Sequence, residues 1–243
     1  MKLIKRYKKL IMLILIIISI FYIYKINNKN NINYTTIGDG FSVGIDSYGI
    51  IDYGYSDYIK DHLEKNNKLN RYVKSFSYQS ISIETLYEQI LSNKKIKLAE
   101  EEINIRKTLR ETNVLTLSIG LNDLLYHINI TKEQTSNSIN KSLKEIENNF
   151  NILIDEIKKY YPKEIYVMGY YNVYPENEYL NQAIKKLNKI YENNEKVIYI
   201  STYELFQNNS SFCSNPSSIY PYRIGYQAIA NEFIVKISKK LEK

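Results

Sequence analysis

The side chains best suited to chemistry in this chain lie in three short segments. The first, Gly38-Asp39-Gly40-Phe41-Ser42, places a carboxylate and a hydroxyl in a glycine-rich turn. The second, Gly120-Leu121-Asn122-Asp123, sets an amide beside a carboxylate, and the third runs from Ser217 to Tyr226. A hydroxyl attacks an ester only when a base takes its proton and fixed donors stabilise the oxyanion. The segments therefore predict a polar pocket, and its chemistry depends on whether they supply a nucleophile and a base.

The elements that position these segments follow an alternating pattern. Short runs of β-forming apolar residues predict strands at Tyr34–Ile37, Arg71–Phe76, Asn113–Ile119, Glu164–Met168 and Lys196–Ile200. Amphipathic periodicity predicts helices at Tyr55–Lys65, Ile83–Ser92, Leu98–Arg110, Lys141–Tyr160, Tyr179–Tyr191 and Ile224–Leu241. This alternation predicts an α/β fold, with a mainly parallel five-stranded sheet and helices on both faces. Ligands of such sheets bind at the carboxyl ends of the strands, where the first two segments lie.

The three segments resemble motif blocks of the SGNH/GDSL hydrolases in order and spacing. Ile37–Gly44 resembles the block Gly-Asp-Ser-(Leu/Ile), and Ser118–Asp123 resembles the block Gly-x-Asn-Asp. Ser217–Pro221, followed by Gly225-Tyr226, resembles Asp-x-x-His-Pro with its downstream Gly-Tyr. The resemblance covers about residues 34–243. It implies a three-layer α/β/α, flavodoxin-like domain of a family with esterase, lipase and carbohydrate-deacylating activities.

The chain differs from these hydrolases at the three positions of their catalytic triad, which is a serine, an aspartate and a histidine. The nucleophilic serine falls on Gly40, the aspartate on Ser217 and the histidine on Tyr220. Gly40 has no side chain, Ser217 has no charge, and a phenol with a pKa of about 10 is a poor base. We therefore predict a catalytically inactive, hydrolase-like protein. The resemblance implies that its ligand pocket is lined by Asp39, Gly40, Ser80, Asn122, Ser217 and Tyr220.

Two alternatives remain open from the sequence. One is an active esterase, lipase or deacylase with a rearranged site, in which Ser42 is the nucleophile and His127 the base. The other is a purely structural ectodomain. The tyrosines of residues 170–175 follow the fourth predicted strand, and they are either plain loop packing or a platform for a sugar ring or an acyl chain.

The net charge of +7 does not indicate a nucleic-acid-binding protein. Residues 1–29 hold 7 of the 33 basic residues and no acidic residue, whereas residues 30–243 hold 26 basic and 26 acidic residues. The neutral remainder offers no basic face for phosphates. There is one cysteine, and the two histidines, His62 and His127, share no metal-ligand spacing. We expect no metal site and no cofactor.

The apolar run Leu10–Tyr24 carries no charge and follows five cations. It predicts a single-pass transmembrane signal-anchor at residues 10–24, after a cytoplasmic basic segment at residues 1–9. Residues 25–33 then form a linker to an extracytoplasmic hydrolase-like domain at residues 34–243. A cleaved signal peptide is the alternative. In this setting the expected partners are the membrane and a cell-envelope glycan, lipid or protein.

Overall fold

The computed structural model describes residues 11–21, 31–98, 100–128, 135–174, 176–213, 215 and 217–241. Its main sheet has the strand order β2-β1-β5-β6-β7, and every neighbouring pair is parallel. The strands are β1 (Ile32–Gly38), β2 (Leu69–Val73), β5 (Val114–Ser118), β6 (Ile165–Met168) and β7 (Val197–Ile200). The predicted five-stranded parallel sheet is therefore confirmed.

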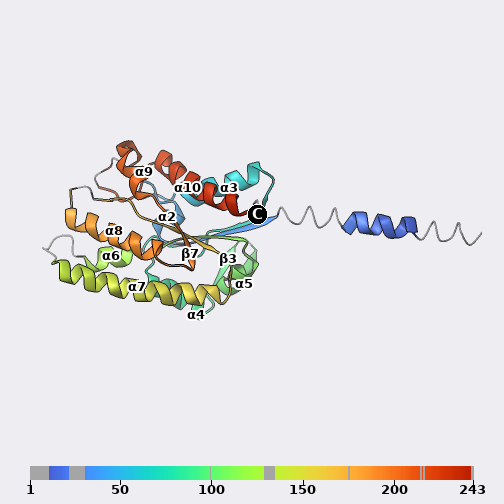
Figure 1. Ribbon diagram of the computed structural model, residues 1–243, viewed down its shortest axis with the longest axis horizontal. Helices are drawn as coiled ribbons and strands as arrows, with labels where there is room; N and C mark the ends of the chain where they lie inside the picture. The colour runs from blue at the N-terminus through green and yellow to red at the C-terminus, as the bar shows by residue number, and fades with distance from the viewer. Residues whose placement is uncertain are drawn as a thin grey trace, which may run out of the picture.

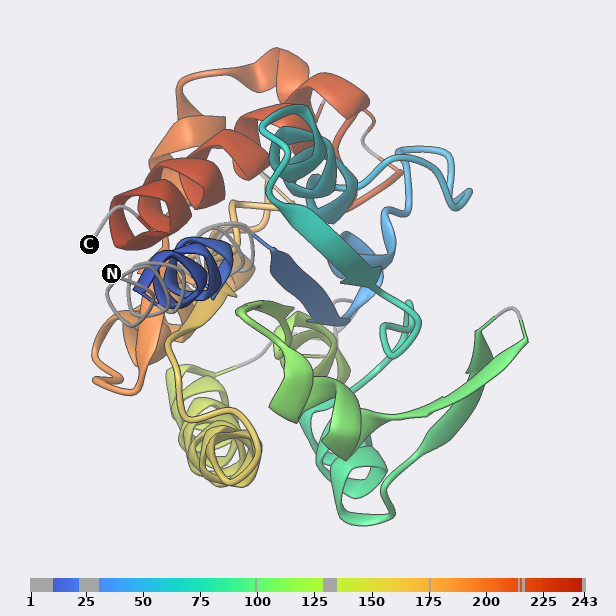
Figure 2. The same ribbon diagram turned by 90° about the vertical axis from the view of Figure 1, so that its right-hand side faces the viewer.

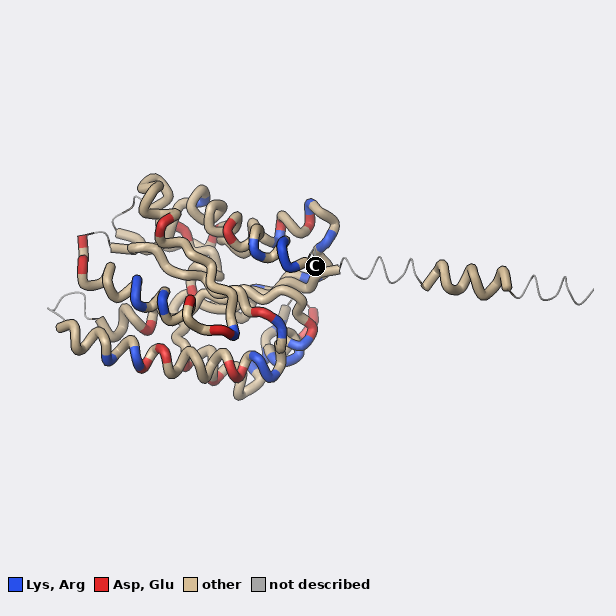
Figure 3. The backbone as a smooth tube through the Cα atoms, in the orientation of Figure 1, with Lys and Arg blue, Asp and Glu red and all other residues tan. Residues whose placement is uncertain are grey.

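Helices cover both faces of this sheet and complete three layers (Figures 1 and 2). On one face, α3 (Tyr55–Lys65) packs beside α10 (Arg223–Leu241). The other face is covered by α4 (Ile83–Leu91), α5 (Ile105–Glu111), α7 (Ser136–Lys158) and α8 (Glu178–Glu192). Every residue of β5 and β6 is buried, as expected for parallel strands covered on both faces. Charged residues lie mostly along the outer helices (Figure 3).

The order of the strands creates a crevice between β1 and β5. After β1 the chain moves outward to β2, and it then returns to the other side of β1 as β5. The loops that leave these two strands diverge, so the crevice opens at their carboxyl ends. The short helix α2 (Gly40–Val43) follows β1 there, and α6 (Leu121–His127) follows β5. The first two chemistry-bearing segments therefore meet at one edge of the sheet.

Glycine allows the two strand ends to approach each other closely. Gly38 has φ +130°, in the region that favours glycine. A Cβ atom on Gly38 would also lie 2.8 Å from the carbonyl carbon of Ser118. Asp39 N–H donates to the Ser118 carbonyl at 2.8 Å and fastens the turn to β5.

The predicted helix over Leu98–Arg110 is wrong in its first half. Residues 95–104 form an antiparallel hairpin of β3 (Lys95–Leu98) and β4 (Glu101–Asn104), and α5 begins only at Ile105. Ile96 and Leu98 are two residues apart, a spacing that suits a strand better than a helix, and Ile96 pairs with Ile103 across the hairpin. Asn104 ends the hairpin and caps α5, because its side chain accepts from the N–H of Lys107 at 2.9 Å.

The N-terminal apolar segment is helical over residues 11–21, all of which are exposed. It lies apart from the domain in Figure 1. Within the part of the chain that the structure describes, no helix is both long enough and apolar enough to cross a bilayer. The described residues therefore do not support the predicted transmembrane helix, and the ends of the predicted span at residues 10 and 22–24 lie outside them.

Candidate functional site

Asp39 organises the turn between β1 and α2. Its Oδ1 accepts from the N–H of Phe41 at 3.1 Å and from the Ser118 hydroxyl at 2.6 Å, while its Oδ2 accepts from the Tyr170 hydroxyl at 2.5 Å. The side chain therefore caps α2 and joins β1 to β5 and to the loop after β6. Only 2% of Asp39 is exposed, and burial raises the pKa of its carboxyl to about 6.

Ser42 points into the protein. Its hydroxyl lies 2.7 Å from the Ser118 hydroxyl, 2.9 Å from the Tyr55 hydroxyl and 3.1 Å from the Ile37 carbonyl. None of the residue is exposed. These contacts make Ser42 part of a buried hydroxyl network beneath the turn, where no substrate reaches it.

His127 lies elsewhere, at the last residue of α6. It is exposed, and its ring makes an edge contact with Tyr126 at 5.7 Å between centroids. It is not among the described hydrogen-bond partners of Ser42. The structure does not bring the two residues of the rearranged site together.

Tyr220 fills the space beside Gly40. A Cβ atom on Gly40 would lie 2.6 Å from Cζ and 2.7 Å from Cε1 of the Tyr220 ring. The ring also packs against Phe41 at 5.1 Å between centroids, and 8% of Tyr220 is exposed. Burial raises the pKa of the Tyr220 phenol above its ordinary value, which favours the neutral phenol. The Tyr220 ring, at the histidine position, thus fills the space that a side chain at the serine position would need.

The third triad position, Ser217, lies on the exposed surface of the loop before α10. Its N–H donates to Oδ1 of Asn215 at 3.0 Å. The Tyr220 N–H in turn donates to the Ser218 hydroxyl at 3.1 Å. Local side-chain acceptors therefore shape this loop, and neither Ser217 nor Ser218 brings a charge to the site.

Asn122 and Asp123 tie α6 to the loop before α4. The Asn122 amide donates to the carbonyls of Gln79 at 3.1 Å and Ile81 at 2.9 Å. Both carboxylate oxygens of Asp123 accept from the N–H of Ile83, at 3.1 and 3.2 Å. An amide nitrogen carries two hydrogens, so both Asn122 donors already have acceptors.

A groove of about 580 Å³ opens at this edge of the sheet. Four of the predicted pocket residues line it, namely Ser80, Asn122, Ser217 and Tyr220. Asp39 and Gly40 are buried and do not belong to the lining. The described residues contain no group of three or more His, Cys, Asp or Glu side chains that could hold a metal ion.

Sequence reasoning missed much of the groove wall. Residues 47–49, Gln79 and Asn215 line it outside the three segments, and residues 218–219 line it within the third segment, but none of them is among the predicted pocket residues. Tyr174 also lines it, from the tyrosine-rich loop after β6, whereas Tyr170 and Tyr171 are buried. The structure therefore separates the tyrosines of this loop into two groups. Its first two rings are packed inside, and the third faces the groove.

Solved structures of a lipase and of two esterases share this architecture. The lipase Lip_vut3 from a goat rumen metagenome superposes with a TM-score of 0.69 at 17% identity, covering 84% of this chain and 96% of that chain. The Clostridium thermocellum family 3 carbohydrate esterase gives 0.59 at 19% identity, covering 87% and 98%. A catalytic mutant of an acetylxylan esterase from Geobacillus stearothermophilus gives 0.60 at 16% identity, covering 85% and 94%. At these identities the likeness concerns the fold.

The sequence itself matches a family model. No curated protein matches the chain. The model of the GDSL-like lipases and acylhydrolases matches residues 34–233, which contain the turn at Gly38, the α6 segment and the loop at Tyr220. The chain therefore belongs to the GDSL-like lipase/acylhydrolase family.

Proposed function

We propose that this protein is a hydrolase-like binding protein, which holds a cell-envelope ligand in the groove and does not cleave esters through a triad. The observation that carries the proposal is the Tyr220 ring in the space that a side chain at position 40 would need. A serine there would overlap the Tyr220 ring unless that ring moved, so the residue at the histidine position is itself the obstacle. Ser217 adds no carboxylate to orient a base.

The other polar groups do not replace the missing chemistry. Ser42 is sealed among Tyr55, Ser118 and Ile37, and an alcohol without a base is a weak nucleophile. The Asn122 donors are bound to two carbonyls, so an oxyanion would have to displace one of them. Among the described residues of the groove wall there is therefore no activated nucleophile and no base, and the Asn122 amide is not a free donor.

Labelling and turnover assays test the loss of chemistry. We expect the full chain to resist a fluorophosphonate probe and to hydrolyse 4-nitrophenyl acetate no faster than its Ser42→Ala variant. The triple variant Gly40→Ser/Ser217→Asp/Tyr220→His, with its fold checked by circular dichroism, shows whether the assay reports on this site. Labelling of the wild type that disappears in Ser42→Ala would overturn the proposal.

The cell-envelope location is a further part of this proposal, and it is supported by the N-terminal sequence. Apart from Ser19, residues 11–21 are apolar, and all of them are exposed. A helix that is apolar on every side is normally covered by protein or lipid. We expect the chain to sediment with membranes and to be released by detergent but not by salt. Recovery of a shortened form from the medium would instead indicate a cleaved signal peptide.

A further inference from the structure

The loop of residues 46–51 has a defined shape at the rim of the groove. Oδ1 of Asp46 accepts from the N–H groups of Tyr48 and Ile50, each at 2.9 Å. Asp46 N–H donates to the Ile50 carbonyl at 2.8 Å. Gly49, with φ +82°, takes the left-handed position that the turn requires. A single carboxylate thus organises the whole turn.

The same loop is fastened to the rest of the groove. Nδ2 of Asn215 donates to the Ser47 carbonyl at 2.6 Å and joins the loop to the segment that carries Tyr220. At the base of the loop, Nε of Arg223 lies 2.6 Å from Oδ2 of Asp52, which ties it to α10. The loop therefore keeps its position without a ligand, and little ordering is needed when one binds.

Tyr48 is displayed to solvent by this fixed loop. Its side chain lines the groove, and 76% of it is exposed. Tyr170 and Tyr171 are buried by contrast, and the other strongly exposed tyrosines, Tyr126 and Tyr179, do not line this groove. Tyr174 adds a second tyrosine to the lining. An exposed aromatic ring on a fixed loop offers an apolar face and a polar edge to a ligand that has both.

Ser47 supplies an unsatisfied hydroxyl beside that ring. Only 2% of Ser47 is exposed, and its Oγ is one of two buried side-chain polar atoms without a hydrogen-bond partner among the described residues. Such atoms are rare in native proteins and call for an explanation. Ser47 forms part of the groove wall, so turning its hydroxyl toward a ligand would break no hydrogen bond.

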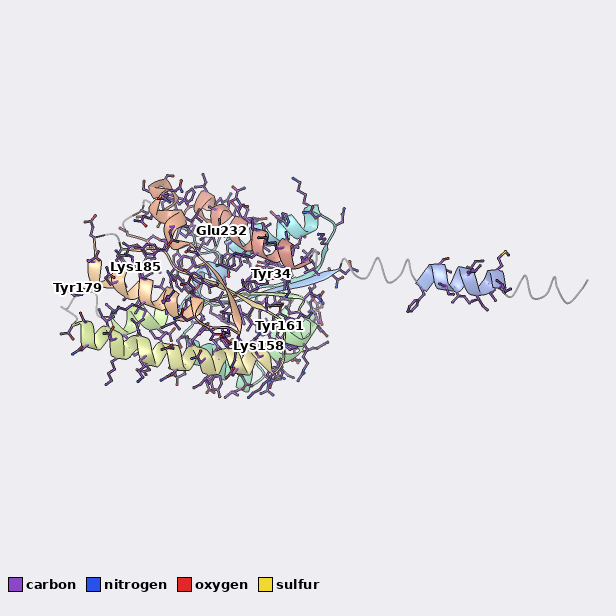
Figure 4. The ribbon with its side chains drawn as sticks, in the orientation of Figure 1. Tyr34, Lys158, Tyr161, Tyr179, Lys185 and Glu232 are labelled. Carbon is purple, nitrogen blue, oxygen red and sulfur yellow. The ribbon has the colours of Figure 1, made fainter. Side chains whose placement is uncertain are left out.

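The lining also restricts the charge of the ligand. The described residues that line the groove are serine, asparagine, glutamine, tyrosine, glycine and one isoleucine, and none carries a charge. A second groove beside β7 contrasts with it, because Lys185 and Glu232, both labelled in Figure 4, line it with four other charged side chains. An anionic ligand would find no countercharge in the first groove, and an acyl chain would find a single aliphatic side chain.

From these observations we infer that the groove binds a neutral glycan, with the Tyr48 ring against the face of a sugar and the Ser47 hydroxyl bonded to one of its hydroxyls. This inference rests on the proposed binding function and names its ligand class. Sugars combine apolar ring faces with many hydrogen-bonding groups, which is the chemistry that the lining complements.

Calorimetric titration of the full chain tests the ligand class. The probes are the hexamers of xylose, mannose and N-acetylglucosamine, with hexagalacturonate as the anionic comparison. We expect at least one neutral hexamer to bind, and hexagalacturonate to bind more weakly. Tyr48→Ala should weaken binding about 3- to 10-fold. Ile50→Ala is the matched control, because Ile50 is 64% exposed on the same loop but does not line the groove.

Ser47→Ala separates binding from folding. We expect this variant to bind the neutral hexamer about 3- to 10-fold more weakly, while its midpoint of denaturation stays the same or rises. A lowered midpoint with unchanged affinity would show that the hydroxyl is structural. Absence of binding by all three neutral hexamers, or equal loss in Tyr48→Ala and Ile50→Ala, would overturn the glycan site. Neither result depends on the labelling and turnover assays, which decide whether triad chemistry is absent.

Discussion

The ring of Tyr220 and the bare backbone of Gly40 are complementary in shape. Ring carbons of Tyr220 lie 2.6 and 2.7 Å from the point where a Cβ atom on Gly40 would sit. Real Cβ atoms do not approach other heavy atoms so closely, so either residue restricts what the other can be. The absence of a side chain at position 40 and the presence of a large one at position 220 are therefore one structural feature.

Gly40→Ser should destabilise the domain without restoring activity. The new side chain would overlap the Tyr220 ring, and forcing extra atoms into a packed site costs about 1–3 kcal/mol. Chemical denaturation measures this loss. In a Tyr220→Ala background the same substitution should cost close to nothing, because the obstacle is gone. Equal costs in the two backgrounds would show that the two residues do not compete for space.

Ser42→Ala should lower stability rather than activity. The substitution removes a buried hydroxyl and leaves Tyr55 and Ser118 with fewer partners, which costs about 1–3 kcal/mol. Ser217→Ala is the matched control, because Ser217 is exposed and a surface substitution usually changes the free energy of unfolding by about 0.5 kcal/mol or less. Urea denaturation of the two variants makes the comparison. Similar midpoints for both would contradict the buried network.

Asn122→Ala should loosen the loop before α4. Its amide donates to the Gln79 and Ile81 carbonyls, and leaving these acceptors unpaired costs about 1–3 kcal/mol. Hydrogen exchange should accelerate over residues 77–83 and stay unchanged in β6. Asn122→Asp should be more harmful, since a carboxylate would face two carbonyl oxygens. Unchanged hydrogen exchange in both variants would show that the Asn122 amide does not hold this loop, and its N–H groups could then donate to a ligand.

The Asp39 carboxyl should make stability depend on pH. Its pKa is raised from 3.8 to about 6 in the folded protein, so the folded state binds more protons than the unfolded state between these values. Stability contributed by Asp39 is therefore complete below about pH 4 and falls as pH rises to about 6, by about 3 kcal/mol.

Asp39→Asn removes this titration, and it serves as the reference for the other ionisable groups. The free energy of unfolding of the wild type should decrease relative to that of Asp39→Asn between pH 4 and pH 7. Denaturation curves at one-unit intervals measure the difference. A difference that is constant across this range would show that the carboxyl has an ordinary pKa in the folded state.

Much of the fold was predictable because its signals are local. The buried strands β5 and β6 are short apolar runs bounded by turns, and α3 spans the predicted residues Tyr55–Lys65. The signal failed at residues 98–104, where a two-residue and a helical spacing overlap and the tertiary context selects a hairpin. Elements as short as α2 and α6 carry too few residues for periodicity to mark them.

By itself the sequence determined which residue types stand at the triad positions and that two of the segments share one edge of the sheet. The motif positions are sufficient for the first and the predicted parallel strands for the second, because the carboxyl ends of parallel strands meet at a common edge. Only the tertiary structure decided that Tyr220 occupies the space at Gly40, that Ser42 faces inward and that the loop at Ser47 and Tyr48 forms a groove wall. The physical reason is that these relationships depend on side-chain volume and direction between segments distant in the chain, which no local pattern encodes.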